Sequence, residues 1–217
     1  MRYKDREFAR REQCILDTAT VLFAEQPWEK VTVAKLAERS GIGKGTVYKH
    51  FVCKEEILAR LVLDFNQACL PIYADLAQVD PPLLALRRIF RKAFDLLLDS
   101  PALAQLIMYC SRKDFQARLR AEYRERFRAV EQAYVELFNR ILERAMANGD
   151  LPAQSVDSLF IGILAAFEGA IARIASGSVF LALQPISREQ YLDSVTDFML
   201  AGVLGMDAVS HLREQDS

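Results

Sequence analysis

Residues that interrupt regular structure, or that build metal and disulfide sites, are scarce in this 217-residue sequence. It holds nine glycines, seven prolines, two histidines and four cysteines. The cysteines form no CxxC pair and have no zinc-type spacing to either histidine, so we expect no metal site. No motif indicates a cofactor, and we expect none.

The sequence also lacks a long hydrophobic run and an N-terminal signal. Its longest apolar stretch, Leu159–Phe167, ends at Glu168, well short of the roughly 18 residues that span a membrane. Residues 1–13 are too charged for a secretory signal. These features predict a reduced, cytoplasmic protein with no membrane partner.

No segment alternates apolar and polar residues long enough to predict a strand. Apolar residues recur instead at intervals of three and four, the period of one face of a helix. Thr32, Ser155, and Ser187 with Gln190 supply helix caps, and Asn148-Gly149 supplies a stop. We predict an all-α protein of about nine helices, at residues 15–26, two short ones within 32–51, then 54–78, 83–98, 102–110, 115–148, 155–176 and from 187 onward.

Charge is distributed unevenly along a chain whose net charge is only −1. Residues 1–54 hold eleven Lys and Arg against seven Asp and Glu, a net charge of +4, so residues 55–217 carry −5. A basic end on an acidic body suits a polyanionic partner at that end alone.

A turn between two short predicted helices is the most informative feature of the sequence. Ser40-Gly41 ends the first helix, and Ile42 is the apolar residue that a tight helix-turn-helix places between its helices. The second helix runs from Gly43-Lys44 to Phe51, and Val47 and Phe51, four residues apart, face the core. The outward side chains are then predicted to be Lys44, Thr46, Tyr48, Lys49 and His50.

Such a helix suits the major groove of DNA, because it offers hydrogen-bond donors, cations for phosphates and no carboxylate. Gly45 would let the backbone approach the DNA closely, and Lys54 would add a phosphate contact. The residues predicted to bind double-stranded DNA are Thr32, Gly43, Lys44, Gly45, Thr46, Tyr48, Lys49, His50 and Lys54.

This segment resembles the tetracycline-repressor (TetR/AcrR) family of bacterial transcriptional regulators. It departs from the family at Gly43, where Ser or Thr is common, and at Cys53, where Ser, Asn or Asp is usual. The residues that carry the resemblance are Thr32, Leu36-Ala37, Gly41-Ile42, Lys44–Phe51, Lys54-Glu55-Glu56 and Leu58.

The resemblance implies an N-terminal three-helix helix-turn-helix domain, assigned to residues 1–53, and a larger C-terminal helical regulatory domain, residues 54–217. It also implies a homodimer that binds a palindromic operator and is released when a small molecule binds. Repression is the family's usual mode, so the resemblance implies a repressor.

An effector pocket is implied by the same resemblance, and the middle of the chain is rich in aromatic and soft side chains whose tyrosines add polar tips. Glu168 interrupts an otherwise apolar helix, and three roles stay open for it: pairing with an arginine, facing a dimer seam, or binding a cationic ligand. The candidate pocket residues are Phe65, Cys69, Tyr73, Met108, Tyr109, Tyr123, Phe127, Phe167 and Glu168.

The last two predicted helices are the candidates for a dimer interface. Small residues between Gly162 and Ala172 permit close helix approach, and the final helix offers apolar residues such as Leu192 and Phe198. Two such helices from each subunit would form a four-helix bundle. Packing within one subunit is the alternative.

Three local features carry competing interpretations. Gly41–Gly45 resembles part of a phosphate-binding loop, but a helix precedes it where a strand is required. The arginines within 118–128 favour a solvated helix face with i,i+4 pairs over a second nucleic-acid surface. Cys53 beside Lys54 at a helix start has surroundings that lower a thiol pKa, so a redox switch stays open besides a simple replacement of a cap residue.

Two other classes of protein fit the sequence less well. No acid, base, nucleophile or metal set is patterned for catalysis, so we predict no enzyme. A helical adaptor would account for the dimer helices but not for the Tyr48-Lys49-His50 face. For a regulator, we expect the effector to shift the helix at 54–78, which holds Pro71, and so to change the spacing of two recognition helices.

Overall fold

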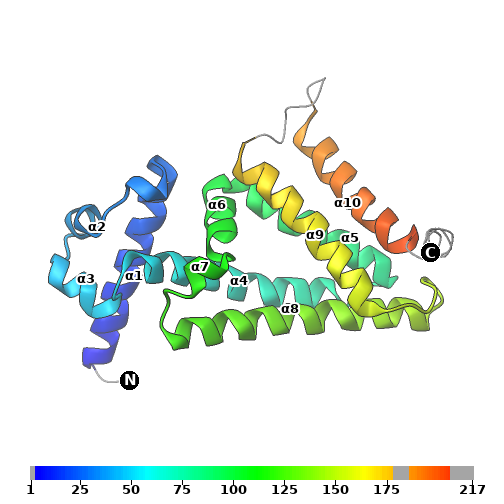
Figure 1. Ribbon diagram of the computed structural model, residues 1–217, viewed down its shortest axis with the longest axis horizontal. Helices are drawn as coiled ribbons and strands as arrows, with labels where there is room; N and C mark the ends of the chain where they lie inside the picture. The colour runs from blue at the N-terminus through cyan, green and yellow to red at the C-terminus, as the bar shows by residue number, and fades with distance from the viewer. Residues whose placement is uncertain (1–2, 178–185, 206–217) are drawn as a thin grey trace. The chain divides into compact units, whose positions relative to one another are not determined.

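The computed structural model describes residues 3–177 and 186–205, which form ten α-helices, one 3₁₀-helix and no strand (Figure 1). This confirms the all-α prediction. The elements are α1 (Tyr3–Glu25), η1 (Trp28–Lys30), α2 (Val33–Ser40), α3 (Lys44–His50), α4 (Lys54–Leu76), α5 (Pro82–Asp99), α6 (Pro101–Cys110), α7 (Lys113–Gln116), α8 (Ala121–Ala147), α9 (Val156–Ala175) and α10 (Arg188–Gly205).

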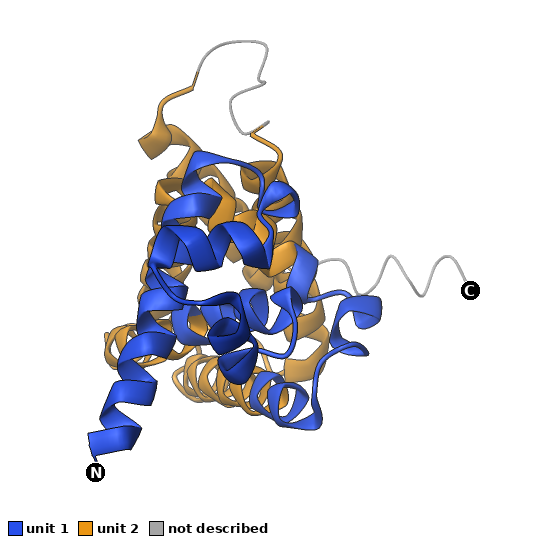
Figure 2. Ribbon diagram, turned by 90° about the vertical axis from the view of Figure 1, so that its left-hand side faces the viewer, with its two compact units in different colours: residues 1–65, 109–127 blue, residues 66–108, 128–217 orange. Residues whose placement is uncertain are grey.

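The chain divides into two compact units (Figure 2). Unit 1 consists of Met1–Phe65 and Tyr109–Phe127, and unit 2 of Asn66–Met108 and Arg128–Ser217. Three helices, α4, α6 and α8, therefore contribute residues to both units.

In unit 1, α1, α2 and α3 pack against one another around an apolar core (Figure 1). Ile15 of α1, Leu36 of α2 and Val47 of α3 are all fully buried. The predicted cap of α2 is confirmed, because the Thr32 hydroxyl accepts a hydrogen bond from the Lys35 amide at 3.2 Å.

The first helix starts twelve residues earlier than the apolar stripe that begins at Ile15, since α1 begins at Tyr3. Its first turns are rich in charged residues, and their aromatic residues, Tyr3 and Phe8, are exposed. Glu7 forms ion pairs of 2.9 Å with both Arg10 and Arg11, at the i+3 and i+4 positions of the helix. Such pairs support a solvent-exposed helix without core packing.

The helix predicted over 115–148 is two helices, α7 and α8, separated by residues 117–120. No glycine or proline marks this break. Leu119 is buried, with 3% exposed, and the next residue, Arg120, reaches Glu56 of α4. Successive residues of a helix point about 100° apart, so an unbroken helix would turn one of these two side chains away. Tertiary contacts therefore decide the break.

In unit 2, α5 packs against α9 and α10, and α9 packs against α10 (Figure 1). The predicted caps are confirmed: the Ser155 hydroxyl accepts from the Ser158 amide at 3.3 Å, and Ser187 and Gln190 bond reciprocally at 3.2 and 2.8 Å. Both helices thus begin where their sequence places the cap.

Arginines join α5 to α10 through a series of ion pairs. Arg87 bonds Asp193 at 2.8 Å and Asp197 at 3.0 Å, and Arg188 of α10 bonds Asp95 of α5 at 2.7 Å. Arg91 pairs with both Glu189 and Asp193. The series fixes the register of α10 on α5, while each partly exposed pair contributes little free energy alone.

Helix α9 is unusual in composition, with a mean hydropathy of 1.7 over an 18-residue window. Its length and composition would allow it to cross a membrane, which the sequence did not predict, although core helices of soluble proteins also meet this criterion. Only 28% of that window is buried. The helix therefore presents a large uncovered apolar surface.

Gly41 is the residue on which the turn between α2 and α3 depends. Its φ is +66°, in the left-handed region that costs a residue with a Cβ about 1–2 kcal/mol. We expect Gly41→Ala to lower the free energy of unfolding by about that amount, measured by urea denaturation. The control is Gly45→Ala, inside α3 with open space around an added Cβ, which should be neutral or stabilising by up to about 1 kcal/mol. Equal effects of the two substitutions would contradict the argument.

Candidate nucleic-acid interface

Helix α3 presents a basic outward face. Lys44, Gly45, Tyr48 and Lys49 are exposed, and Val47 on the opposite side is fully buried. The helix contains no acidic residue, and within the described chain no carboxylate pairs with Lys44 or Lys49. Unpaired cations on a short helix with an exposed tyrosine are what contacts with phosphates and base edges require.

The expectation that His50 belongs to this outward face is wrong, because only 8% of it is exposed. Its ring lies 3.9 Å from the ring of Phe8, and its Nδ1 lies 3.7 Å from Glu12 Oε2. His50 follows Val47 by three residues and therefore shares its inward face. That spacing is visible in the sequence.

Two other residues predicted to bind DNA, Thr32 and Lys54, have structural partners of their own. Thr32 is exposed and caps α2, and Gly43 is exposed at the N-cap of α3, with a φ of −57°. Lys54 is half-buried, and its Nζ donates to the carbonyl oxygens of Trp28 and Glu29 at 3.2 and 3.3 Å. Lys54 thus holds η1 to the start of α4. Thr46, within α3, is half-buried.

A carboxylate whose burial the sequence did not predict lies in the first turn of α4. Glu56 is 1% exposed, and its Oε2 accepts a hydrogen bond from the Val52 amide at 2.9 Å. Arg120 binds the same carboxylate through two nitrogens, with Nη2 2.9 Å from Oε2. Glu56 thereby accepts a backbone hydrogen bond from the turn between α3 and α4, and through Arg120 it joins this turn to the start of α8.

Two more ion pairs join the first half of α4 to the segment that follows α6. Arg118 Nη1 lies 3.7 Å from Glu55, and Arg126 Nη2 lies 3.6 Å from Asp64. The expected i,i+4 pairing occurs at Arg118, which lies 3.4 Å from Asp114. Arg120 and Arg126, by contrast, pair with acids of α4. These side chains are therefore engaged within unit 1 and do not form a free nucleic-acid surface.

Cys53 has surroundings opposite to those expected of a reactive thiol. Burial raises the pKa of this thiol, and the neighbouring charges of Glu55 and Glu56 raise it further. The lower pKa expected from the helix start and Lys54 is wrong. A raised pKa lowers the thiolate fraction and argues against a redox switch.

Of the nine candidate effector residues, five lie in unit 2. Two of these, Cys69 and Tyr73, are buried one helical turn apart on α4, and burial raises the pKa of both. Tyr134 lies beside them, with its ring centroid 6.0 Å from that of Tyr73 and its hydroxyl donating to the Asn66 carbonyl at 3.1 Å. The sequence prediction omits Tyr134 from this group.

The remaining members of unit 2 are not part of that cluster in the observed contacts. Phe167 is half-buried, with its ring 4.9 Å from that of Phe94, and Met108 is half-buried. Glu168 is exposed on α9, where it shares the uncovered face. Within the described residues, Glu168 forms no ion pair with an arginine.

The four candidates in unit 1 have packing partners there. Tyr109 stacks near Trp28 with ring centroids 4.2 Å apart and meets the ring of Phe115 at 4.9 Å. Tyr123 is buried, with the guanidinium carbons of Arg120 and Arg126 5.6 and 5.9 Å from its ring centroid. Phe65 and Phe127 are half-buried.

Residues 15–61 match the family described as bacterial regulatory proteins, tetR family. Through this segment the chain is similar to the tetR family. The matched residues contain α2, the turn at Gly41, α3 and the start of α4, which are the elements that build the basic face.

Two curated relatives match about two thirds of this chain. The HTH-type transcriptional repressor KstR2 of Mycobacterium tuberculosis is 27% identical over 65% of this chain and 72% of its own length. The fatty acid metabolism regulator protein of Bacillus subtilis is 25% identical over 63% of this chain and 69% of its own length.

Solved structures share the fold of this chain at low identity. The TetR-family regulator PfmR of Thermus thermophilus is 21% identical, covers 87% of this chain and 96% of its own, and has a TM-score of 0.66. FadR of Bacillus subtilis, solved in complex with stearoyl-CoA, is 18% identical, covers 88% and 97%, and has a TM-score of 0.65. The fold therefore extends well beyond the matched N-terminal segment.

The ion pair between Arg120 and Glu56 can be tested by mutation. We expect Arg120→Ala to lower the free energy of unfolding by about 1–3 kcal/mol, because it leaves the buried carboxylate with the Val52 amide as its hydrogen-bond partner. Thermal and urea unfolding measure the change. Arg112→Ala is the control, since Arg112 pairs with a comparably exposed Asp114 and its loss should change stability little. An Arg120→Ala protein as stable as the wild type would show that water replaces the guanidinium without cost.

Proposed function

We propose that this protein is a homodimeric, effector-responsive transcriptional repressor that binds a palindromic operator. The observation that carries the proposal is the outward face of α3, where Lys44, Tyr48 and Lys49 are exposed beside Gly45. Lys44 and Lys49 supply phosphate contacts, and Tyr48 and Thr46 supply contacts to bases. His50 is left out of the interface, because its burial assigns it to the packing of α1 against α3.

We infer dimerisation because one such helix contacts only a few base pairs. A helix of seven residues contacts a single half-site, so two-fold symmetry is needed to double the base contacts. The uncovered surface of α9 and α10 suits this role. Its large exposed apolar residues are Ile161, Leu164, Phe198 and Leu204.

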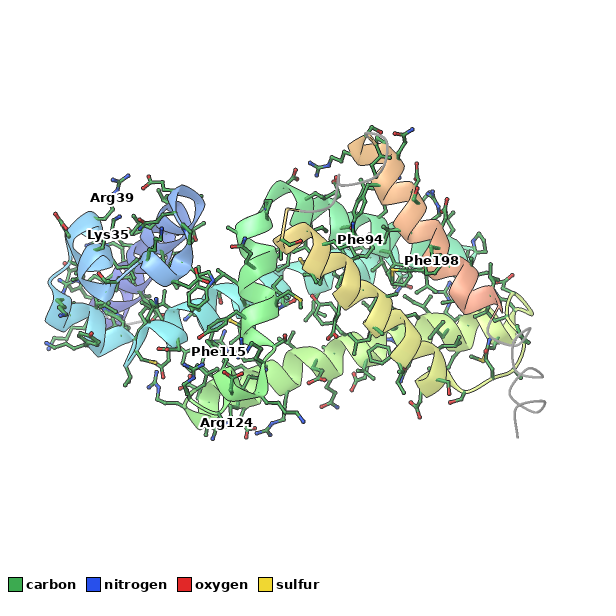
Figure 3. All side chains as sticks on the ribbon, turned by 45° about the horizontal axis from the view of Figure 1, so that its top comes forward. Lys35, Arg39, Phe94, Phe115, Arg124 and Phe198 are labelled. Carbon is green, nitrogen blue, oxygen red and sulfur yellow. The ribbon has the colours of Figure 1, made fainter. Side chains whose placement is uncertain are left out.

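Between α9 and α10 this surface is hollowed to a volume of about 120 Å³, lined by residues that include Gly162, Ala166 and Gly202. Phe198 of α10, labelled in Figure 3, also lines this hollow. A Cβ added at Gly162, Gly169 or Gly202 would meet nothing within 4 Å. The missing side chains thus leave open space on the surface, into which apolar side chains of a second copy can insert. The position of Glu168 on this face favours its role at the dimer seam.

For the effector, we propose a fatty acyl thioester of coenzyme A. The support is the likeness to a fatty acid metabolism regulator and to a regulator solved with stearoyl-CoA, together with the apolar core of unit 2 and its buried tyrosines. Another structural neighbour, RolR, was solved with resorcinol and has a TM-score of 0.57 at 17% identity, so resorcinol is the comparison ligand. The effector acts by binding the DNA-incompetent state more tightly, with α4 as the helix that belongs to both units.

The operator is found by selection from a random-sequence duplex pool. We expect an enriched palindrome for the wild type, with affinity falling as salt is raised because phosphate contacts release counterions. Tyr48→Ala should lose about 1–3 kcal/mol of binding free energy and relax specificity, and Lys49→Ala should weaken binding to all sequences alike. Fluorescence anisotropy on the selected operator measures both.

Arg140→Ala is the matched control for these variants, because Arg140 is exposed on α8 in unit 2. Its operator affinity should equal that of the wild type. No enriched sequence at low salt, from a folded dimer, would refute the regulator and favour a helical adaptor. Addition of stearoyl-CoA to the operator complex should release the DNA, and resorcinol should not.

The dimer interface is tested by Phe198→Asp. Phe198 is 75% exposed, so the substitution should leave the fold intact, while a buried charge at the seam opposes association. Analytical ultracentrifugation should show a monomer, with a large loss of operator affinity. Val21→Asp is the control, since Val21 is 48% exposed on α1. If Phe198→Asp stayed dimeric, another surface would form the interface.

A further inference from the structure

A second hollow of unit 2 differs in chemistry from the apolar surface of α9 and α10. It is an open groove of about 310 Å³ between α5, the end of α4 and the start of α10, and we call it the α5–α10 groove. Leu76 and Leu192 supply its apolar lining, and Arg88, Arg91 and Lys92 supply three cations.

The two carboxylates that line the α5–α10 groove are already engaged. Asp95 accepts hydrogen bonds from Arg188 at 2.7 and 3.0 Å. Glu189 pairs with Arg91, whose guanidinium also bonds Asp193. Among the described residues, no carboxylate pairs with Arg88 or Lys92. These two cations are therefore available to an anion.

Arg88 and Lys92 are four residues apart on α5 and thus point to the same side of the helix. Two like charges at this spacing repel each other, and an anion bound between them removes that repulsion. The guanidinium of Arg88 offers a planar pair of donors, and the ammonium of Lys92 offers a point charge, which together suit the oxygens of phosphate groups.

Lys92 also lies close to the buried cluster of unit 2. It is half-buried, and although burial raises the pKa of the Cys69 thiol, the charge of Lys92 is near enough to oppose that rise. Cys69 in turn precedes Tyr73 by one helical turn on α4. The groove's Lys92 is thus within electrostatic reach of Cys69, one of the candidate effector residues.

We propose that the α5–α10 groove binds the phosphate-bearing end of an amphiphilic effector, with Arg88 and Lys92 on the phosphates and Leu76 and Leu192 against its apolar part. The inference rests on the proposed acyl thioester effector and adds the site that recognises its charged end. The phosphates of the thioester and free phosphate share this chemistry, so the probes must separate the two sources.

Isothermal titration calorimetry on the full-length protein tests the groove with four probes: stearoyl-CoA, coenzyme A without the acyl chain, stearate and inorganic pyrophosphate. We expect stearoyl-CoA to bind most tightly. The double variant Arg88→Ala/Lys92→Ala should weaken stearoyl-CoA by about tenfold or more, because two charge-assisted contacts are lost, and should leave stearate unchanged. Added salt should reduce the difference.

Arg140→Ala again serves as the matched control, because it removes an exposed cation of unit 2 outside the groove. Unfolding curves that match the wild type confirm that the double variant is folded. Equal stearoyl-CoA affinity of the double variant and the wild type overturns the groove, while release of the operator by stearoyl-CoA still supports the proposed function.

Two further results would also overturn the inference. Pyrophosphate binding as tight as stearoyl-CoA would show a site for free phosphate and not for an amphiphile. If none of the phosphate-bearing probes binds a wild-type protein that binds its operator, both the groove and the acyl thioester effector fail, while the DNA-binding function stands.

Discussion

The buried carboxylate of Glu56 is the interaction on which the arrangement of unit 1 depends. A charge that is 1% exposed is tolerated only if hydrogen bonds replace the water it has lost. The Val52 amide and the Arg120 guanidinium provide them, one from the turn after α3 and the other from the segment before α8. Because neither partner can move away without leaving the charge unsatisfied, the turn after α3 and the first turn of α4 are tied to Arg120, 64 residues beyond Glu56.

The same principle accounts for the arginines, most of which form ion pairs within their own unit. In unit 1, Arg118, Arg120 and Arg126 bind acidic residues of α4. In unit 2, Arg87 and Arg91 of α5 bind an acidic residue of α10, and Arg188 of α10 binds an acidic residue of α5. The lysines of α3 have no such partners in the described chain and stay available for the proposed contacts with DNA. A nearly neutral chain can thus present a basic face, since most of its cations are neutralised locally.

The sequence predicted the local structure well wherever short-range signals act. The caps at Thr32, Ser155 and Ser187, the turn at Gly41 and the inward face of Val47 all depend on residues within four positions of one another, and all are present in the structure. Prediction failed at His50, where a donor side chain was assigned outward although its spacing from Val47 placed it inward. It failed also at residues 117–120, where no breaker residue marks the end of α7.

By itself, the sequence determined the helical class, the helix-turn-helix and its basic face, because periodicity, caps and turn residues are local properties of the chain. Only the tertiary structure decided which arginines are neutralised, that Glu56 is buried, that the pKa of the Cys53 thiol is raised, and that Arg88 and Lys92 share a groove with Leu192. Those facts depend on contacts between side chains far apart in the sequence, and on the loss of water around those side chains. No local sequence pattern predicts such contacts or such a loss of water.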